Sequence, residues 1–408
     1  MAIIGMDIHR SFAQAAFLQD GQIKREQRVD LVHDRLVEFA RTLSGEDEVV
    51  IEATGNSAAV ERILRPFVKR IVVANPRMVR AIAYARVKTD KIDAIILAKL
   101  HAGGFLPEVW VADDDTQRRR RQTAERMSVL EQMVRTKGRL HAILHANLIP
   151  KYSGHLFGKA GKDWLKGLPL PDEERRIVGR LVDELERNSE QLAFLDKTIT
   201  RGALEDPHAV RLMTIPGIGP IVAATVLASI GDISRFSAPE KLSCYFGLTP
   251  KIRQSGDHPA RHGRISKQGN THARKMLVEA AWSAMLAPGP LRAFFERVRR
   301  IRGAPAAAVA TARKLAVMIW HVLTDGTECA YARPAFTAMK PRKAALKAGA
   351  PREYGKAGPG HDYWIKEIRE RENDYVARAE HAYERMVAAW RERPAKPKAP
   401  TRPATASC

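Results

Sequence analysis

The sequence contains few cysteines. Only three occur among its 408 residues, Cys244, Cys329 and Cys408, and no two of them are closely spaced as a pair. Cysteines that form a disulfide framework or a zinc site occur in paired, regular spacings. We therefore expect free thiols in a reducing compartment, and neither a disulfide framework nor a cysteine-based zinc site.

Long apolar segments are also scarce. No apolar run is expected to reach the length of a transmembrane helix, and the N-terminus lacks the charged and apolar regions of a secretory signal. These features predict an intracellular protein with no membrane partner.

Acidic residues are outnumbered by basic ones. The chain has 46 Asp and Glu against 68 Lys and Arg, which gives a formal net charge of +22. Such a surplus favours a polyanionic partner, most often nucleic acid, and its size disfavours a basic protein without such a partner. The length allows two or three domains. We place their bounds at 1–112, 113–207, 208–330 and a final segment, 331–408.

Residues 1–112 alternate between strand and helix patterns. The order is strand, hairpin, helix, strand, helix, strand and helices, as in an RNase H-like (RuvC-like) α/β domain. The strands are predicted at 2–8, 12–18, 22–29, 48–51 and 70–74. The helices are predicted at 31–43, at 57–64 with Ser57 as N-cap, after Pro76, and from Asp90 onward.

Four acids in this region lie at positions where a carboxylate is unfavourable unless it has a specific structural or functional role. Asp7 lies inside an apolar run, and Glu52 ends another. Asp90 and Asp93 lie three residues apart on one face of the predicted helix. A buried carboxylate is costly unless it is paired or binds a metal, and Mg²⁺ or Mn²⁺ prefers oxygen ligands. For any one of these acids alone, a structural role is the favoured interpretation. Asp90 could cap the helix, and Asp93 could pair with Lys91 or Lys99. Together, the four predict a divalent-metal site.

Residues 113–207 are predicted to be helical. Apolar residues recur at steps of three, four or seven between Ile177 and Ile199, as in a coiled-coil seam. Two interpretations are equally favoured. The stripe is either the seam of an oligomerising arm, or the inner face of a helical hairpin within one chain.

Residues 208–330 contain a turn rich in glycine and a basic loop. Pro216-Gly-Ile-Gly219 between two predicted helices resembles the hairpin of a helix-hairpin-helix, in which Gly217 and Gly219 would let a phosphate approach the backbone. Residues 272–286 and 306–323 are also predicted to be helical, the second as a core helix.

Ser255 lies in the polar loop that follows. The surrounding cations, Arg253, Arg261, Arg264 and Lys267, are candidates for nucleic-acid binding. On chemistry alone, Ser-Gly favours a turn residue over a nucleophile, because no side chain is identifiable as its base, although His258 and His262 are nearby in the sequence. In the last segment we expect a basic run at Lys340–Lys347, a charged helix at 363–390, and a disordered basic tail from Arg393.

The ordered set of motifs resembles the transposases of the insertion-sequence one-hundred-and-ten family, which are DEDD-type recombinases guided by a bridge RNA. The motifs span residues 1 to about 325. They are Gly5-Met-Asp-Ile8, Ile51-Glu-Ala-Thr-Gly55, Lys88-Thr-Asp-Lys-Ile-Asp-Ala94, Ile215-Pro-Gly-Ile-Gly219, Gly231-Asp-Ile-Ser-Arg-Phe236, Gly247-Leu-Thr-Pro250, Gln254-Ser-Gly256 and Gly263-Arg-Ile-Ser-Lys-Gln-Gly-Asn270.

The resemblance implies a function. Asp7, Glu52, Asp90 and Asp93 would match the family's metal tetrad, with Mg²⁺ as cofactor, and Ser255 its nucleophile, which reverses the preference for a turn residue. The implied partners are the element ends and target DNA, a non-coding bridge RNA, and further copies of the chain in a dimer or tetramer.

Two other functions remain open. A nuclease resembling a Holliday-junction resolvase would use the same acids with water as nucleophile. A scaffold without catalytic activity would need none of the acids.

Overall fold

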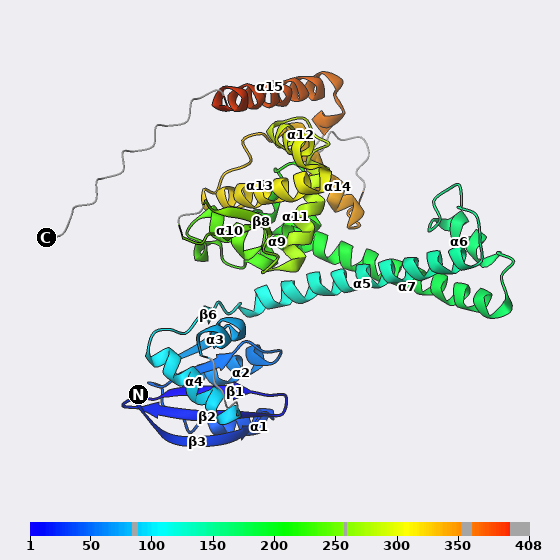
Figure 1. Cartoon of the computed structure of the whole chain (residues 1–408). Helices are drawn as coiled ribbons and strands as arrows, with labels where there is room; N and C mark the ends of the chain where they lie inside the picture. The colour runs from blue at the N-terminus through cyan, green and yellow to red at the C-terminus, as the bar shows by residue number, and fades with distance from the viewer. Residues whose placement is uncertain (84–88, 257–258, 352–360, 392–408) are drawn as a thin grey trace. The chain divides into compact units, whose positions relative to one another are not determined.

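The computed structural model of the chain describes residues 1–83, 89–256, 259–351 and 361–391. They form two compact units, Met1–Asp113 and Asp114–Cys408 (Figure 1). Lys88, His258 and the tail from Arg393 lie outside the described residues.

The first unit is a mixed α/β domain. Its strands are β1 (Ile3–Ile8), β2 (Phe12–Gln19), β3 (Gln22–Asp30), β4 (Glu48–Glu52), β5 (Arg70–Ala74) and β6 (Glu108–Val109). Its helices are α1 (His33–Ala40), α2 (Ser57–Leu64), η1 (Arg65–Phe67), α3 (Pro76–Ile82) and α4 (Asp90–Ala102).

A single sheet organises this unit in the order β3-β2-β1-β4-β5-β6. The strands β1, β4 and β5 are parallel, whereas β2, β3 and β6 are antiparallel to their neighbours. This order, with a hairpin followed by parallel strands, is compatible with the RNase H-like fold predicted from the sequence. The predicted strand positions agree with the observed ones within about two residues, and β6 was not predicted.

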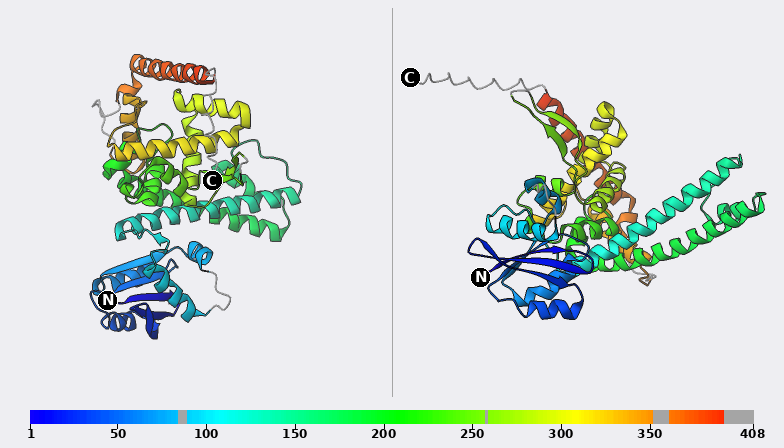
Figure 2. Two further views of the ribbon diagram at one scale, coloured as in Figure 1. Left: turned by 60° about the vertical axis from the view of Figure 1, so that its left-hand side comes forward. Right: turned by 60° about the horizontal axis from the view of Figure 1, so that its bottom comes forward.

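Helices cover both faces of the sheet (Figures 1 and 2). On one face, Met6 and Ile51 join a core with Leu36 of α1 and Leu64 of α2. On the other face, Val50, Val72 and Ala74 join Leu97 of α4. Because side chains alternate along a strand, Gly5 and Asp7 lie on the α4 side of β1.

Gly5 is the point where α4 meets β1. A Cβ atom at Gly5 would overlap the carbonyl oxygen of Ala94 and lie 2.8 Å from the backbone nitrogen of Ala98. The absence of a side chain therefore allows the backbone of α4 to lie directly against the strand. Asp7 is two residues further along the same face, so this contact sets its distance from the start of α4.

Two helix predictions in this unit were wrong in detail. Ser57 does not cap α2, because Asn56 is the N-cap residue and the Ser57 hydroxyl donates to the carbonyl oxygen of Thr54 instead. The first helix was predicted at 31–43 but spans His33–Ala40, since the backbone N–H of Leu31 still pairs with the Ser11 carbonyl.

The second unit is mostly helical. Its helices are α5 (Asp114–Ala146), α6 (Lys159–Lys166), α7 (Asp172–Glu205), α8 (Pro207–Leu212), α9 (Pro220–Ile230), η2 (Ile233–Arg235), α10 (Pro239–Tyr245), α11 (Thr271–Ala284), α12 (Pro290–Arg302), α13 (Ala304–Thr324), α14 (Pro334–Lys347), η3 (His361–Trp364) and α15 (Lys366–Arg391). Its strands are β7 (Pro250–Arg253) and β8 (Arg261–Ile265). Of these, α6, α10, α12 and α14 and the two strands were not predicted.

The long helices α5 and α7 lie side by side (Figures 1 and 2). The apolar stripe of α7 includes Leu181 and Leu185, which share a core with Leu140 and Leu144 of α5. The chain thus covers this part of the stripe with its own helix, as in a helical hairpin. The oligomerising role of the arm stays a prediction.

The largest core of this unit joins α8, α9, α11 and α13. Contrary to the sequence-based expectation, one described helix, α13, is long and apolar enough to cross a membrane by length and composition alone. Half of that apolar stretch is buried within the protein, and Leu315 and Ile319 lie in the core. The prediction that residues 306–323 form a core helix is confirmed.

The charged helix α15 is attached to α12 by one carboxylate. Glu380 accepts hydrogen bonds from the Gly289 backbone N–H and from the Arg292 guanidinium. The hydrogen bonds to Arg292 and Gly289 lower the pKa of the Glu380 carboxyl, despite the opposing effect of burial. The pair therefore holds the end of the described chain on the helical unit.

We predict that Gly5→Ala destabilises the protein by about 1–3 kcal/mol, because the new methyl group must push the backbone of α4 away from β1. Thermal unfolding of the full chain measures this effect. Gly45→Ala is the matched control, since a Cβ there meets no atom within 4 Å. Equal melting temperatures for the two variants would contradict the close approach of α4 and β1.

Candidate active site and nucleic-acid interface

Asp7 and Glu52 lie side by side on neighbouring strands. The parallel register pairs Met6 of β1 with Ile51 of β4, so the next residues along each strand, Asp7 and Glu52, are also neighbours. Adjacent strands are about 4.8 Å apart, and paired residues point to the same face. The two predicted acids are therefore brought together by the sheet alone.

Asp90 and Asp93 lie in the first turn of α4. Thr89 is the N-cap, and its hydroxyl oxygen accepts a hydrogen bond of 3.3 Å from the Ile92 N–H. The interpretation of Asp90 as the cap is therefore wrong. Carboxylates in a first turn are stabilised by the helix dipole, and a spacing of three residues places both on one helical face.

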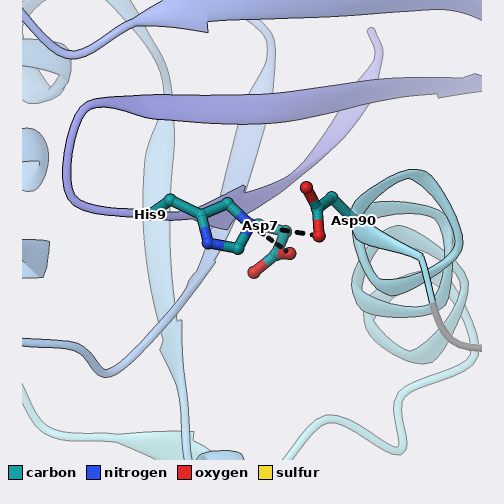
Figure 3. A group of neighbouring side chains, drawn as sticks. All are labelled: Asp7, His9 and Asp90. Carbon is teal, nitrogen blue, oxygen red and sulfur yellow. Dashed lines mark ion pairs between the residues drawn. The ribbon is translucent and has the colours of Figure 1, made fainter.

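His9 lies between two of the acids (Figure 3). Its Nε2 atom is 3.2 Å from Oδ2 of Asp7 and 3.2 Å from Oδ1 of Asp90. The Asp7 side chain is 15% exposed and that of Asp90 47%, so the cluster opens to solvent on the helix side. The Nε2 atom is buried, and its alignment makes a hydrogen bond with neither carboxylate.

The residues of this cluster fit a divalent cation. Asp7 and Asp90 each provide a carboxylate oxygen and His9 a ring nitrogen, and these three atoms lie within 4.8 Å of one another. Carboxylates this close repel each other unless a positive charge lies between them. Oxygen donors suit Mg²⁺, and the imidazole nitrogen is tolerated better by Mn²⁺ than by Mg²⁺. His9 was not predicted, although it stands only two residues after Asp7.

Ser255 lies in the second unit, in the loop between β7 and β8, and it is exposed. The next residue, Gly256, has a φ of 55°, which only glycine adopts readily. The hairpin is antiparallel and pairs Arg253 directly with Arg261. Like charges opposite one another destabilise a strand pair, so this position favours a bound anion.

The base of this hairpin is tightly closed. A Cβ atom at Gly269 would overlap the carbonyl oxygen of Tyr245, and one at Gly247 would lie 2.7 Å from the carbonyl oxygen of Gln268. Both glycines also have positive φ angles. Lys267, predicted to bind nucleic acid, has a φ of 56° and is exposed, as are Arg253, Arg261 and Arg264. The glycines therefore fix the base from which these cations extend.

The loop from Thr214 to Gly219, between α8 and α9, packs against another helix of the same chain. The sequence had predicted only a contact with a phosphate. A Cβ at Gly217 would overlap the carbonyl oxygen of Ala280 in α11, so its missing side chain admits a helix of the same chain. A Cβ at Gly219 would meet no atom within 4 Å. Of the two glycines, only Gly219 has open space where a Cβ would stand, and nucleic-acid binding by both stays a prediction.

Lys340 of α14 holds this loop from inside. Its Nζ atom donates to the carbonyl oxygens of Met213 at 2.7 Å, Ile215 at 3.1 Å and Ile218 at 3.2 Å. Burial, followed by the nearby Arg333 guanidinium, lowers the pKa of Lys340 to about 8. The sequence showed Lys340 as part of a basic run, and nothing in the run marked it as the buried member.

Two family models match the chain. Residues 4–148 match a model of DEDD-type transposases described as "Transposase", and residues 209–296 match "Transposase IS116/IS110/IS902 family". The first range contains Asp7, Glu52, Asp90 and Asp93, and the second contains Ser255. Neither range includes Lys340.

Proteins of three bacteria are similar to this chain over different lengths. The y4qE protein of Sinorhizobium fredii, which is named as a transposase, is 26% identical over 301 residues, 70% of this chain and 73% of the relative. The transposase for insertion sequence element IS1111A of Coxiella burnetii is 32% identical over 163 residues, 38% of this chain and 43% of the relative. The transposase for insertion sequence element IS1328 of Yersinia enterocolitica is 25% identical over 283 residues, 68% of this chain and 84% of the relative.

We predict that the first unit binds Mn²⁺ through Asp7 and Asp90. Asp7→Asn and Asp90→Asn each remove a charged oxygen ligand and should weaken Mn²⁺ binding at least about tenfold. Titration calorimetry on the full chain measures this loss. The exposed Asp34 is the matched control, and Asp34→Asn should bind as the unaltered chain does. Unchanged binding by the Asp7 and Asp90 variants would refute the metal site.

We predict a pH-dependent stability difference between the unaltered chain and Lys340→Met. The folded-state pKa of about 8 lies below the ordinary value of 10.5, so between these pH values the unfolded chain binds one more proton than the folded chain. The unfolding free energy of the unaltered chain should therefore rise relative to the variant between pH 8 and 10.5, by up to about 3 kcal/mol. Urea unfolding at several pH values measures it. A constant difference would show that folding does not lower the pKa of Lys340.

Proposed function

Because this chain belongs to the IS110 family of transposases, we propose that it cuts and rejoins the DNA strands of an insertion sequence. The observation that carries this proposal is the convergence of Asp7, His9 and Asp90 at the junction of β1 and α4. The cluster is open to solvent and negatively charged, and it lies in a family-matched domain. A phosphodiester can approach such a site only with a cation present, which agrees with a metal-dependent reaction.

Asp7, Glu52, Asp90 and Asp93 would hold Mg²⁺, or Mn²⁺, through their carboxylate oxygens. Such an ion polarises a phosphodiester and offsets the charge that develops in phosphoryl transfer. The protein's own part is to hold the four carboxylates, two on neighbouring strands and two on one face of α4. His9 lies between Asp7 and Asp90, with its Nε2 atom 3.2 Å from a carboxylate oxygen of each.

Ser255 is the proposed nucleophile. Its hydroxyl loses a proton as the oxygen attacks phosphorus, the bond from phosphorus to the leaving strand's oxygen breaks, and that oxygen gains a proton to leave as a free hydroxyl. The phosphoserine link keeps the phosphodiester energy, so a hydroxyl of another strand can later displace Ser255 and reseal the DNA. The paired Arg253 and Arg261 flank the loop and provide charge for the bound phosphate.

The partners of the reaction are proposed on chemical grounds. The net charge of +22 suits binding of both DNA duplexes and a non-coding bridge RNA. A dimer or tetramer would bring further copies of Ser255 to the carboxylates. The arm formed by α5 and α7 offers a surface for such assembly, since Val134 and Phe194 are each 68% exposed. A cytoplasmic, nucleoid-associated location would follow from these substrates.

A nuclease that uses water is the second candidate. It is favoured by one observation, the exposed turn position of Ser255 before Gly256, which suits a structural serine as well as a nucleophile. In that reaction the carboxylate cluster would be used in the same way, and no covalent link between protein and DNA would form.

We predict that the protein forms a covalent adduct with DNA carrying the element junction, in the presence of Mg²⁺ and the RNA from the element ends. The adduct should survive denaturation and disappear in Ser255→Ala, because no other group replaces the attacking oxygen. Asp90→Asn should also abolish it. Ser266→Ala is the matched control, since Ser266 directly follows β8 of the same hairpin and its backbone N–H, not its hydroxyl, donates to the Thr249 carbonyl. Cleavage without an adduct, unchanged in Ser255→Ala, would establish the water-using nuclease instead.

A further inference from the structure

A cavity of about 730 Å³ lies in the second unit, between α7, α14 and the loop that precedes α9. The apolar part of its lining, called the floor below, includes Ile221, Phe336 and Met339. Five of the side chains that line it are basic: Lys197, Arg333, Lys340, Lys343 and Lys347. The cavity therefore combines an apolar floor with an excess of positive charge.

The positive charge is not balanced by acids in the lining. Asp196 is the one acid among the cavity's described lining residues, and it pairs with Arg126 of α5. Within the described parts of the chain, Lys343 and Lys347 have no ion-pair partner, and both are exposed. Since they are separated by four residues on α14, they lie on one face of the helix. An anion in the cavity would meet both of them.

Hydrogen bonds hold α14, which forms one wall of the cavity, against the loop and α7. Lys340 lies on the same face of α14, three residues before Lys343, and its ammonium group fixes three carbonyl oxygens of the loop. Arg201 of α7 donates to the Ala348 carbonyl at the end of α14 at 3.2 Å. These contacts attach α14 to both the loop and α7, so the lysines are held at a fixed distance from Gly219 and the start of α9.

The backbone of the loop adds to the attraction for anions. Gly219 is the N-cap of α9 and provides no side-chain cap, and Pro220 follows it. The N–H groups of Ile221 and Val222 in the first helical turn therefore point toward the cavity end without a helical acceptor.

We infer that this cavity binds a backbone phosphate of duplex DNA, with the sugar against the apolar floor and the phosphate on Lys343, Lys347 and the start of α9. The inference rests on the proposed function and adds a contact surface to it. The lysines come from α14, which lies outside both family-matched ranges, 4–148 and 209–296. The contact positions DNA without reading its sequence, because phosphates are the same at every base pair.

The test measures the affinity of the full chain for a labelled DNA duplex of arbitrary sequence at several salt concentrations. In Lys343→Glu/Lys347→Glu the affinity should fall at least about tenfold, and the slope of log affinity against log salt should decrease by about 2, because each lysine that no longer neutralises a phosphate removes about one unit. Lys24→Glu/Lys241→Glu is the matched control. It makes the same charge change at two exposed lysines outside the cavity and should alter affinity far less.

Folding is checked by thermal unfolding of each variant, and Lys343→Gln/Lys347→Gln should show a smaller loss in the same direction. Equal losses in the cavity and control variants would overturn the inference, because the effect would then be one of net charge. A loss confined to an RNA duplex of matched length, with DNA binding unchanged, would overturn it in favour of an RNA contact. If the Ser255 adduct forms normally while neither double variant changes DNA affinity, the cavity assignment fails and the proposed function stands.

Discussion

The carboxylate site depends on one close backbone contact. Gly5 in β1 and Ala94 in α4 touch without an intervening side chain, and Asp7 and Asp90 lie a short distance from that contact on the same two elements. A larger residue at position 5 would separate the elements that carry the acids. The site is therefore specified as much by the missing atoms of Gly5 as by the charges of the carboxylates.

Glycines also allow close backbone contacts in the second unit. Gly217, Gly247 and Gly269 each lie where an added Cβ would meet another part of the backbone or a neighbouring side chain. Gly217 brings the loop against α11, whereas Gly247 and Gly269 close the base of the hairpin that carries Ser255. The carboxylate cluster and the hairpin that carries Ser255 are thus both positioned by close backbone contacts at glycines, and their charged side chains extend from these contacts.

The sequence predicted the first unit better than the second. Alternating apolar residues and turn signals located β1 to β5, and the spacing of Asp90 and Asp93 placed them on one helical face, because these are local properties. His9 could not be predicted, because its role depends on Asp90 of α4, which lies 81 residues later and is brought close only by the fold. The buried Lys340 could not be distinguished from its exposed neighbours, because burial depends on the loop from Thr214 to Gly219, over 120 residues away.

The hold of Lys340 on the loop from Thr214 to Gly219 has a consequence for how the molecule is made. A growing chain emerges from its N-terminus, so α8, the loop and α9 leave the ribosome before α14. Until Lys340 arrives, three backbone carbonyl oxygens lack the ammonium group that joins them in the finished protein. A truncated chain ending before α14 would therefore carry the family's motifs without the contacts that hold the loop.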